Sequence, residues 1–157
     1  MAPTLLFDID SIDLNALAMT TADIEAINPH RGPMRLLDGV IWADYDAGHS
    51  VAYRDVRHDE FWNEGHIPGR PIFPGVLMIE AAAQFASLFY LKDEPDVEFM
   101  GFAGVENVKF RGMVTPGDRL ILLLNEIERR KRRCKCEIQG MVNGNLVFEA
   151  MVIGMPM

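Results

Sequence analysis

The sequence has 157 residues, 49% hydrophobic and 24% charged, which is typical of one soluble globular domain with a sizeable core. Fifteen Lys and Arg against 23 Asp and Glu give a net charge of −8, a sign that argues against nucleic acid as a partner. The two cysteines, Cys134 and Cys136, would form only a strained disulfide, and two thiols alone make a poor metal site. We therefore expect reduced cysteines in a cytoplasmic protein.

The N-terminal segment shows no export signal. Residues 1–17 carry three aspartates and no basic residue before their apolar stretch. The most apolar stretch, residues 76–91, contains Glu80 and Gln84 and is too short and too polar to span a membrane. We expect a soluble, cytoplasmic protein with a loose arm over residues 1–20 and one domain over residues 21–157.

The first predicted elements are a short helix and two strands. Thr20 or Thr21 can cap a helix that runs through Ile27, and Pro29 ends it. Residues 36–46 and 49–56 read as strands joined by a turn that contains a glycine. Five glycines and prolines make residues 57–74 a loop with little regular hydrogen bonding.

A helix is predicted from residues 74–75 to about residue 90. Thirteen of the 17 residues from Gly75 to Leu91 are apolar, and a helix that is apolar all round is normally buried on all sides. Strands follow at 97–111, 118–131, 132–142 and 145–154, and Asn143-Gly144 marks a tight hairpin. The pattern predicts an α+β fold in which a mostly antiparallel sheet wraps one long helix.

Glu80 is unusual because it lies inside the most apolar helix of the chain. A buried carboxylate must find a partner or stay protonated. Glu80, Gln84 and Ser87 follow at i, i+4 and i+7, so they form one polar stripe on the helix. Such a stripe either lines a cavity or reaches solvent at the edge of the sheet.

His66 lies in the stiff loop before this helix. A lone loop histidine is more often incidental, but the next element begins at Gly75, where helix-start N–H groups are free to face an oxyanion. Gly75 has no side chain to block that approach. A histidine, free amides and a buried carboxylate within fifteen residues are together less easily incidental.

The segment HIPGRPIFPGVLMIEAAAQ, residues 66–84, resembles the active-site motif of the 3-hydroxyacyl-[acyl carrier protein] dehydratases of the FabZ type, which have the hot-dog fold. The resemblance extends from about Ile27 to Ile153. Weaker matches fall in the family's order, at Pro29-His30-Arg31, Leu37-Asp38, Phe102-Ala103-Gly104, Val108-Lys109-Phe110-Arg111 and Val114-Thr115-Pro116-Gly117-Asp118.

The resemblance implies a role for each motif residue. His66 matches the catalytic histidine, Glu80 the catalytic carboxylate, Gly75 the residue whose amide contacts the thioester carbonyl, and Gln84 a helix glutamine near the carboxylate. The sister FabA group, which also isomerises the double bond, usually has Asp at position 80, so Glu80 favours dehydration alone. The residues expected to line the site are Phe73, Pro74, Val76, Gln84 and Phe102.

The implied reaction removes water from a 3-hydroxyacyl thioester and yields a trans-2-enoyl thioester, as in fatty acid or related acyl-chain biosynthesis. His66 would take the C2 proton as general base, and Glu80 would protonate the leaving C3 hydroxyl as general acid. No metal or redox cofactor is needed. The chain departs from the family at Met34-Arg35, at Ile67 and at Gly101, where many members have an aromatic residue, which leaves acyl-chain shape and length open.

The other histidines carry weaker signals. His30 is tempting as a third catalytic group, but its place in a turn favours a structural role. His49 and His58 belong to no motif and are expected at the surface.

A basic cluster, Arg129, Arg130, Lys131, Arg132, Arg133 and Lys135, stands out in an acidic chain. It is either a solvated hairpin end or a dock for an acidic acyl carrier protein that bears the substrate on phosphopantetheine. The resemblance also implies a homodimer or a dimer-based hexamer, with His66 from one chain and Glu80 from the other in each site.

Two other functions stay open. A hot-dog thioesterase shares the fold, but the proline-rich His66 loop argues against it. A hot-dog module that binds an acyl chain without turnover is disfavoured by the intact pair of His66 and Glu80.

Overall fold

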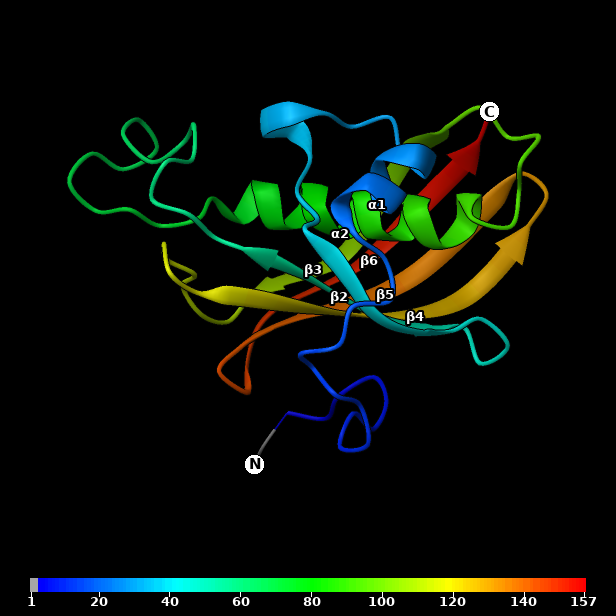
Figure 1. Ribbon diagram of the computed structural model, residues 1–157, viewed down its shortest axis with the longest axis horizontal. Helices are drawn as coiled ribbons and strands as arrows, with labels where there is room; N and C mark the ends of the chain where they lie inside the picture. The colour runs from blue at the N-terminus through cyan, green and yellow to red at the C-terminus, as the bar shows by residue number, and fades with distance from the viewer. Residues whose placement is uncertain (1–2) are drawn as a thin grey trace.

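The computed structural model describes residues 3–157 and shows a six-stranded antiparallel sheet curled around one long helix, α2 (Figure 1). The strand order is β1-β2-β4-β5-β6-β3. This confirms the predicted fold class. The elements are α1 Thr21–Ile27, a 3-10 turn Gly32–Met34, β1 Gly39–Asp44, β2 His49–Asp55, α2 Gly75–Leu91, β3 Met100–Phe110, β4 Arg119–Arg130, β5 Arg133–Val142 and β6 Asn145–Pro156.

Local signals set the ends of several elements as predicted. Thr20 caps α1, and a capping box joins it to Asp23. The β5–β6 hairpin turns at Asn143 and Gly144, whose φ angles of 49° and 78° suit the tight turn expected there. These angles suit the pairing of Val142 with Asn145, where the β5–β6 ladder begins.

Helix α2 is buried over its last two turns and exposed at its start. Every residue from Gln84 to Leu91 is buried, whereas Val76 is 69% exposed. The expectation of burial on all sides is therefore wrong for the first turn, which lies beside the projecting 57–74 loop (Figure 1). No helix among residues 3–157 is long and apolar enough to cross a membrane.

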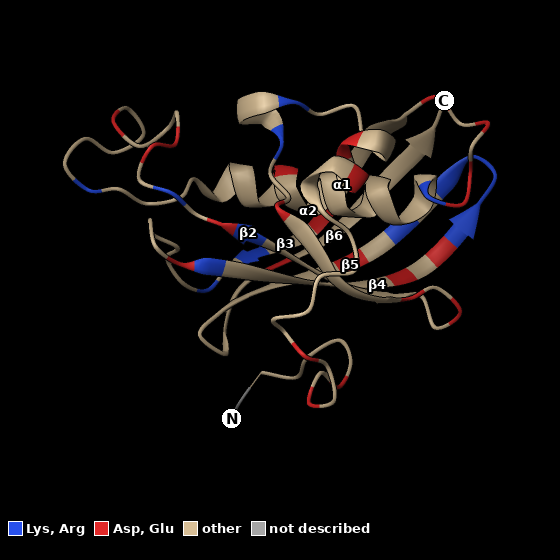
Figure 2. Cartoon of the chain, in the orientation of Figure 1, with Lys and Arg blue, Asp and Glu red and all other residues tan. Residues whose placement is uncertain are grey.

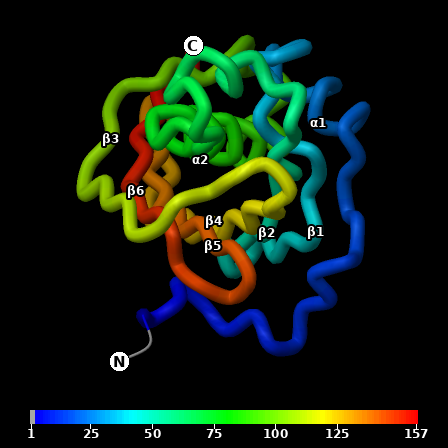
Figure 3. The backbone as a smooth tube through the Cα atoms, turned by 90° about the vertical axis from the view of Figure 1, so that its left-hand side faces the viewer, coloured from blue at the N-terminus to red at the C-terminus, as the bar shows by residue number. Residues whose placement is uncertain are grey.

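The N-terminal arm packs against the outer face of the sheet, opposite α2 (Figure 3). Its Leu6 N–H donates to Gln139 Oε1 at 2.9 Å, and Phe7 stacks on His49 with ring centroids 4.3 Å apart. Farther along, Met19 bridges to Val40 on β1. Residues 1–2 lie outside the described part, and the division of the chain at residue 20 stays a prediction. The arm's apolar contacts to the outer face come from Leu5, Leu6, Phe7, Ile9, Ile12 and Leu14.

Strand β3 forms an edge of the sheet. It spans 11 residues and pairs only with β6 among the described strands. Phe102 is 51% exposed and Phe110 52% exposed, so this edge is apolar as well as unpaired. A long apolar edge strand is a template for pairing with another chain.

Candidate active site

The 57–74 loop is irregular but firmly attached. The rings of Trp62 and Phe73 are 4% and 1% exposed, and their centroids lie 5.5 Å apart. The Phe73 N–H donates to the Val114 carbonyl at 2.7 Å, and the His66 N–H donates to the Trp62 carbonyl at 2.9 Å. These contacts fix the backbone on both sides of the exposed His66 ring.

The His66 ring has a defined tautomer. Its Nδ1 lies 2.9 Å from the carbonyl oxygen of Ile72. A carbonyl can only accept, so Nδ1 carries the proton of the neutral ring and Nε2 keeps its lone pair. His66 therefore presents a basic nitrogen at the surface of the loop.

A buried charge network ties the loop to β2. The Arg54 side chain is 2% exposed and forms ion pairs with Asp38 and with Glu60, which belongs to the loop. A buried guanidinium without such partners would be costly. Sequence reasoning missed Arg54, although the period of β2 places it on the same face as the fully buried Ala52.

Glu80 is held by the polar stripe of α2. Gln84 Nε2 donates to Glu80 Oε1 at 2.9 Å and to the Met34 carbonyl at 2.6 Å, while Gln84 Oε1 accepts from the Leu36 N–H at 2.9 Å. Gln84 is 2% exposed and Ser87 is 6% exposed. The polar stripe of α2 thus faces residues 28–36. The alternative that the stripe reaches solvent is wrong for Gln84 and Ser87.

The His30 ring lies beside the Glu80 carboxylate, a contact that the sequence did not predict. Its Nε2 lies 3.6 Å from Glu80 Oε1. Burial lowers the pKa of His30. The Glu80 carboxylate partly offsets this shift, and the Arg31 cation adds to it. The ring is therefore neutral at neutral pH. The two residues are 50 positions apart, so no local spacing could have indicated this contact.

A cavity of about 60 Å³ extends along α2 from Glu80. Its polar lining includes His30, Glu80 and Gln84, and its other lining residues include Met100, Phe102 and Cys134. Cys134 and Cys136 are both free and buried. Among residues 3–157 no group of three His, Cys, Asp or Glu is placed to hold a metal ion.

The structure gathers some of the predicted site residues and separates others. Glu80, Gln84 and Phe102 line the cavity. Phe73 and Pro74 are buried at the end of the loop, and Val76 points into solvent. No ion pair or hydrogen bond within the described residues of one chain joins His66 to Glu80.

Gly75 begins α2 beneath the ring of Phe110. A Cβ at Gly75 would come within 2.8 Å of that ring. Any larger residue at position 75 would therefore have to displace the Phe110 ring, which is 52% exposed. The Leu77 and Met78 N–H groups donate to the Pro74 carbonyl, whereas the Gly75 N–H makes no backbone hydrogen bond within the described chain.

The basic cluster lies on the β4–β5 hairpin, at the end of the sheet away from the 57–74 loop (Figure 2). Arg129 forms an ion pair with Glu126, and its guanidinium lies over the Tyr90 ring, 4.5 Å from the ring centroid. Arg130 and Arg133 both pair with Glu128. Within the described chain, Lys131 and Arg132 at the turn make no ion pair, so their charges remain available.

Comparison with known proteins gives consistent matches. The family model described as FabA-like domain matches residues 28–151. The "3-hydroxyacyl-[acyl-carrier-protein] dehydratase FabZ" of Lawsonia intracellularis is 42% identical over 135 residues, covering 83% of this chain and 87% of the relative. The protein of the same name from Herpetosiphon aurantiacus is 37% identical over 132 residues, covering 83% and 93%.

Solved structures with low sequence identity share the fold. A dehydratase heterocomplex, ApeI:P from Xenorhabdus doucetiae, superposes with a TM-score of 0.73 at 18% identity, covering 85% of this chain and 90% of the other. Cj0977, a sigma28-regulated virulence protein from Campylobacter jejuni, gives a TM-score of 0.69 at 15% identity, covering 93% and 96%.

The Arg54–Glu60 pair can be tested by Glu60→Gln. This change leaves a buried guanidinium with one carboxylate fewer, so we expect the free energy of unfolding to fall by about 3 kcal/mol. The 57–74 loop should also be cut faster by trypsin. Urea denaturation and limited proteolysis measure the two effects. Asp59→Asn is the matched control because its side chain is 87% exposed. Equal behaviour of the two variants would contradict the role of Glu60.

The pKa of His30 predicts an acid-sensitive fold. The unfolded chain binds a proton at this site with a pKa near 6.5, whereas the folded chain resists that proton because its pKa is lowered. The stability that His30 contributes is therefore present above pH 6.5 and is lost as the pH falls through the lowered value. His30→Gln should flatten the fall of unfolding free energy below pH 6.5, measured by urea denaturation across the pH range. An unchanged slope would contradict this.

Proposed function

The chain belongs to the FabA-like family, and we propose that it removes water from 3-hydroxyacyl thioesters held by an acyl carrier protein. The observation that carries this proposal is the Glu80 carboxylate, fixed by Gln84 at the end of a cavity, in a chain whose His66 offers a free Nε2. Identity of 42% to a relative named as such a dehydratase favours dehydration over thioester hydrolysis or acyl binding without turnover.

His66 is the general base of this mechanism. Its Nε2 takes the C2 proton, and the Ile72 carbonyl stabilises the imidazolium through the proton on Nδ1. Negative charge then develops on the thioester oxygen. The Gly75 N–H and the positive end of the α2 dipole stabilise that oxygen.

Glu80 is the general acid. Gln84 donates to Oε1, which leaves the second carboxyl oxygen to hold the proton. That proton goes to the C3 hydroxyl as the C3–O bond breaks, so the products are water and a trans-2-enoyl thioester. Transfer of the C2 proton from His66 back to Glu80 through water restores the starting state.

We propose that two chains share each site through β3. One end of β3 packs on the start of α2 at Gly75, and its other end, near Phe102, lines the Glu80 cavity. Antiparallel pairing of two β3 edges brings the partner's helix start and 57–74 loop towards this chain's cavity. The absence of a direct His66–Glu80 contact within the described chain supports this arrangement.

The proposed carrier dock narrows to the hairpin tip. Lys131 and Arg132 supply the charge that is not already paired within the described chain, and acyl carrier proteins are acidic. The free cysteines support a reducing compartment, so a cytoplasmic location stays part of the proposal.

Loss of either proposed proton-transfer group should abolish turnover. We expect His66→Ala and Glu80→Gln each to lower kcat by about 10²–10⁴-fold, because each removes one proton-transfer partner. Absorbance of the enoyl thioester measures the rate, and circular dichroism checks the fold. His58→Ala, an exposed histidine of the same loop, is the control and should keep full activity. Near-normal turnover in either variant would refute its assignment.

Mixing the two inactive variants tests the shared site. A heterodimer of His66→Ala and Glu80→Gln chains has one site with both lesions and one with neither, so activity should reappear after subunit exchange. If each site lies in one chain, every site keeps a lesion. Persistent inactivity, with heterodimers seen by native mass spectrometry, would refute sharing.

The hairpin dock predicts a carrier-specific defect. Lys131→Glu with Arg132→Glu should raise KM for carrier-protein substrates and leave N-acetylcysteamine thioesters unaffected. The effect should shrink at high salt, because exposed charges are screened. The N-acetylcysteamine substrate is the internal control, because a general loss of folded enzyme would lower turnover of both substrate types. An equal rise in KM with both substrate types would contradict the proposed docking site.

A further inference from the structure

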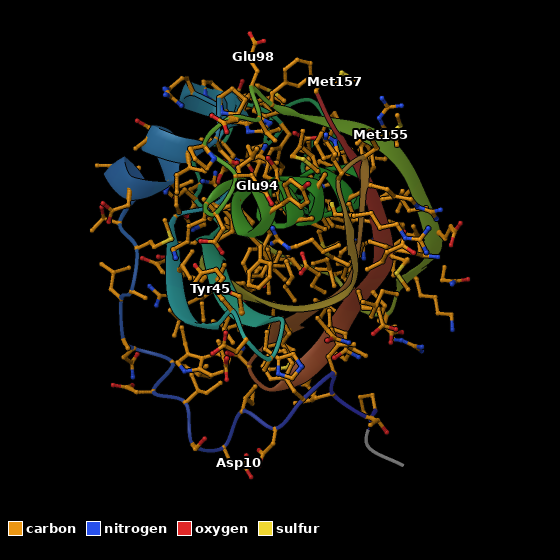
Figure 4. All side chains as sticks on the ribbon, turned by 90° about the vertical axis from the view of Figure 1, so that its right-hand side faces the viewer. Asp10, Tyr45, Glu94, Glu98, Met155 and Met157 are labelled. Atoms are coloured by element: carbon orange, nitrogen blue, oxygen red, sulfur yellow. The ribbon has the colours of Figure 1, made fainter. Side chains whose placement is uncertain are left out.

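Two free thiols lie on the inner face of β5 and take no part in the proposed mechanism. Cys134 and Cys136 are two residues apart on the strand, so their side chains point to the same face. Both are buried, and Cys134 packs against Tyr90 and Leu91 of α2. Figure 4 looks at the end of the molecule where α2 finishes and shows the sheet curled around the helix. Both thiols therefore point into the space between the sheet and the helix.

The cavity beside Glu80 reaches one of these thiols. Cys134 lines it together with Gly154 of β6, whereas Cys136 is not among the described residues around it. Cys134 and Gly154 lie opposite each other in the β5–β6 ladder, and the Cys134 Sγ is 2.9 Å from where a Cβ of Gly154 would be. The missing side chain at Gly154 thus leaves room for the sulfur. A molecule in the cavity meets Cys134 and not Cys136.

The neighbours of Cys134 favour its thiolate, the form of cysteine that acts as a nucleophile. The Cys136 thiol contributes most to lowering the pKa of Cys134, and the Gly154 N–H adds to it, while burial opposes both. The Arg129 cation also lowers this pKa, and the Glu126 carboxylate raises it. Cys134 itself and burial raise the pKa of Cys136 well above its usual value. Cys136 therefore keeps its proton, and Cys134 is the nucleophile of the pair.

The cavity also selects the molecules that can reach the sulfur. Its volume is about 60 Å³, and its lining includes the apolar side chains of Ala83, Ala86 and Val152. Cys134 is 0% exposed, so a reagent must leave bulk water to meet it. A charged reagent would lose its hydration there, which is costly, whereas a small uncharged one would not.

We propose that Cys134 is a covalent modification site, reached through the Glu80 cavity by small, uncharged α,β-unsaturated carbonyl compounds. A thiolate is a soft nucleophile, and the β-carbon of such a compound is a soft electrophile. The enoyl thioester of the proposed reaction carries the same group, so a molecule of this class is formed beside the same cavity. The site goes beyond the proposed function, because the adduct forms without turnover.

The step is a conjugate addition. The Cys134 sulfur forms a bond to the β-carbon, and the electron pair of the carbon–carbon double bond moves towards the carbonyl group as an enolate. The proton that the thiol gave up ends on the α-carbon. Nothing leaves, nothing is oxidised or reduced, and the protein gains the whole mass of the reagent.

The adduct occupies the cavity that Glu80 lines. A group bonded to the Cys134 sulfur fills part of a space of only about 60 Å³. Substrate and adduct therefore compete for the same volume, and modification should stop turnover although neither His66 nor Glu80 is altered.

Alkylation with acrylamide tests the site. Acrylamide is a small, uncharged α,β-unsaturated carbonyl compound, and intact-protein mass spectrometry counts its adducts. We expect native wild-type protein to gain one adduct and Cys134→Ala to gain none. Cys136→Ala is the matched control and should gain the single adduct, because its Cys134 still lines the cavity. In urea both thiols of the wild type should react, which gives two adducts.

Peptide mapping locates the adduct, and circular dichroism checks the fold of each variant. Cys134→Ser takes the place of Cys134→Ala if the alanine variant does not fold. A wild-type protein that gains no adduct when native but two in urea would overturn the site. An adduct on Cys136 of the native protein, or one that persists in Cys134→Ala, would also overturn it.

Turnover after alkylation gives a second readout. Wild-type activity should fall in proportion to the adduct, whereas Cys134→Ala should keep its own starting rate after the same treatment. Full turnover of a fully modified wild type would contradict the competition for the cavity. A wild type inactive on every substrate before treatment would refute the proposed function, and the mass shift alone would then decide the modification site.

Discussion

The buried amide of Gln84 organises the region around Glu80. An amide inside an apolar core must satisfy both its oxygen and its nitrogen, and Gln84 does so with the backbone of Leu36 and Met34 as well as with Glu80. One side chain thereby fixes residues 28–36 against α2, brings His30 beside the carboxylate and holds Glu80 in one orientation. A helix that was wholly apolar would pack equally well but would leave that segment and that carboxylate without a fixed position.

A second constraint acts on the loop that carries His66. The 57–74 loop has no sheet or helix to hold it, so Arg54 and Glu60 tie it to β2 while Trp62 and Phe73 bury its ends. The result is a stiff loop that presents His66 at the surface of its own chain. In the proposed mechanism each chain therefore supplies a base from this loop and a half-buried acid from α2, and β3 is the edge on which two chains would pair.

Much of this could be predicted from the sequence, because the signals were local. The cap at Thr20, the turn at Asn143 and the apolar run of α2 each fix an element through its own residues. The Glu80–Gln84 contact followed from helical spacing. The contact of His30 with Glu80 and the clamp of Arg54 on Glu60 depend on how distant segments meet, and no local pattern encodes that. The exposure of Val76 was missed for the same reason, since burial depends on what surrounds a helix end.

The N-terminal arm bears on how many copies of the chain can associate. It covers the outer face of the sheet, and its Met19 bridges to Val40 on β1, at the edge opposite β3. A sheet with two open edges can add copies at both and grow into a fibre, whereas one with a single open edge can pair only once, about a two-fold axis. By pairing with Val40, Met19 covers the β1 edge at that point, so β3 is left as the longer uncovered edge among the described strands.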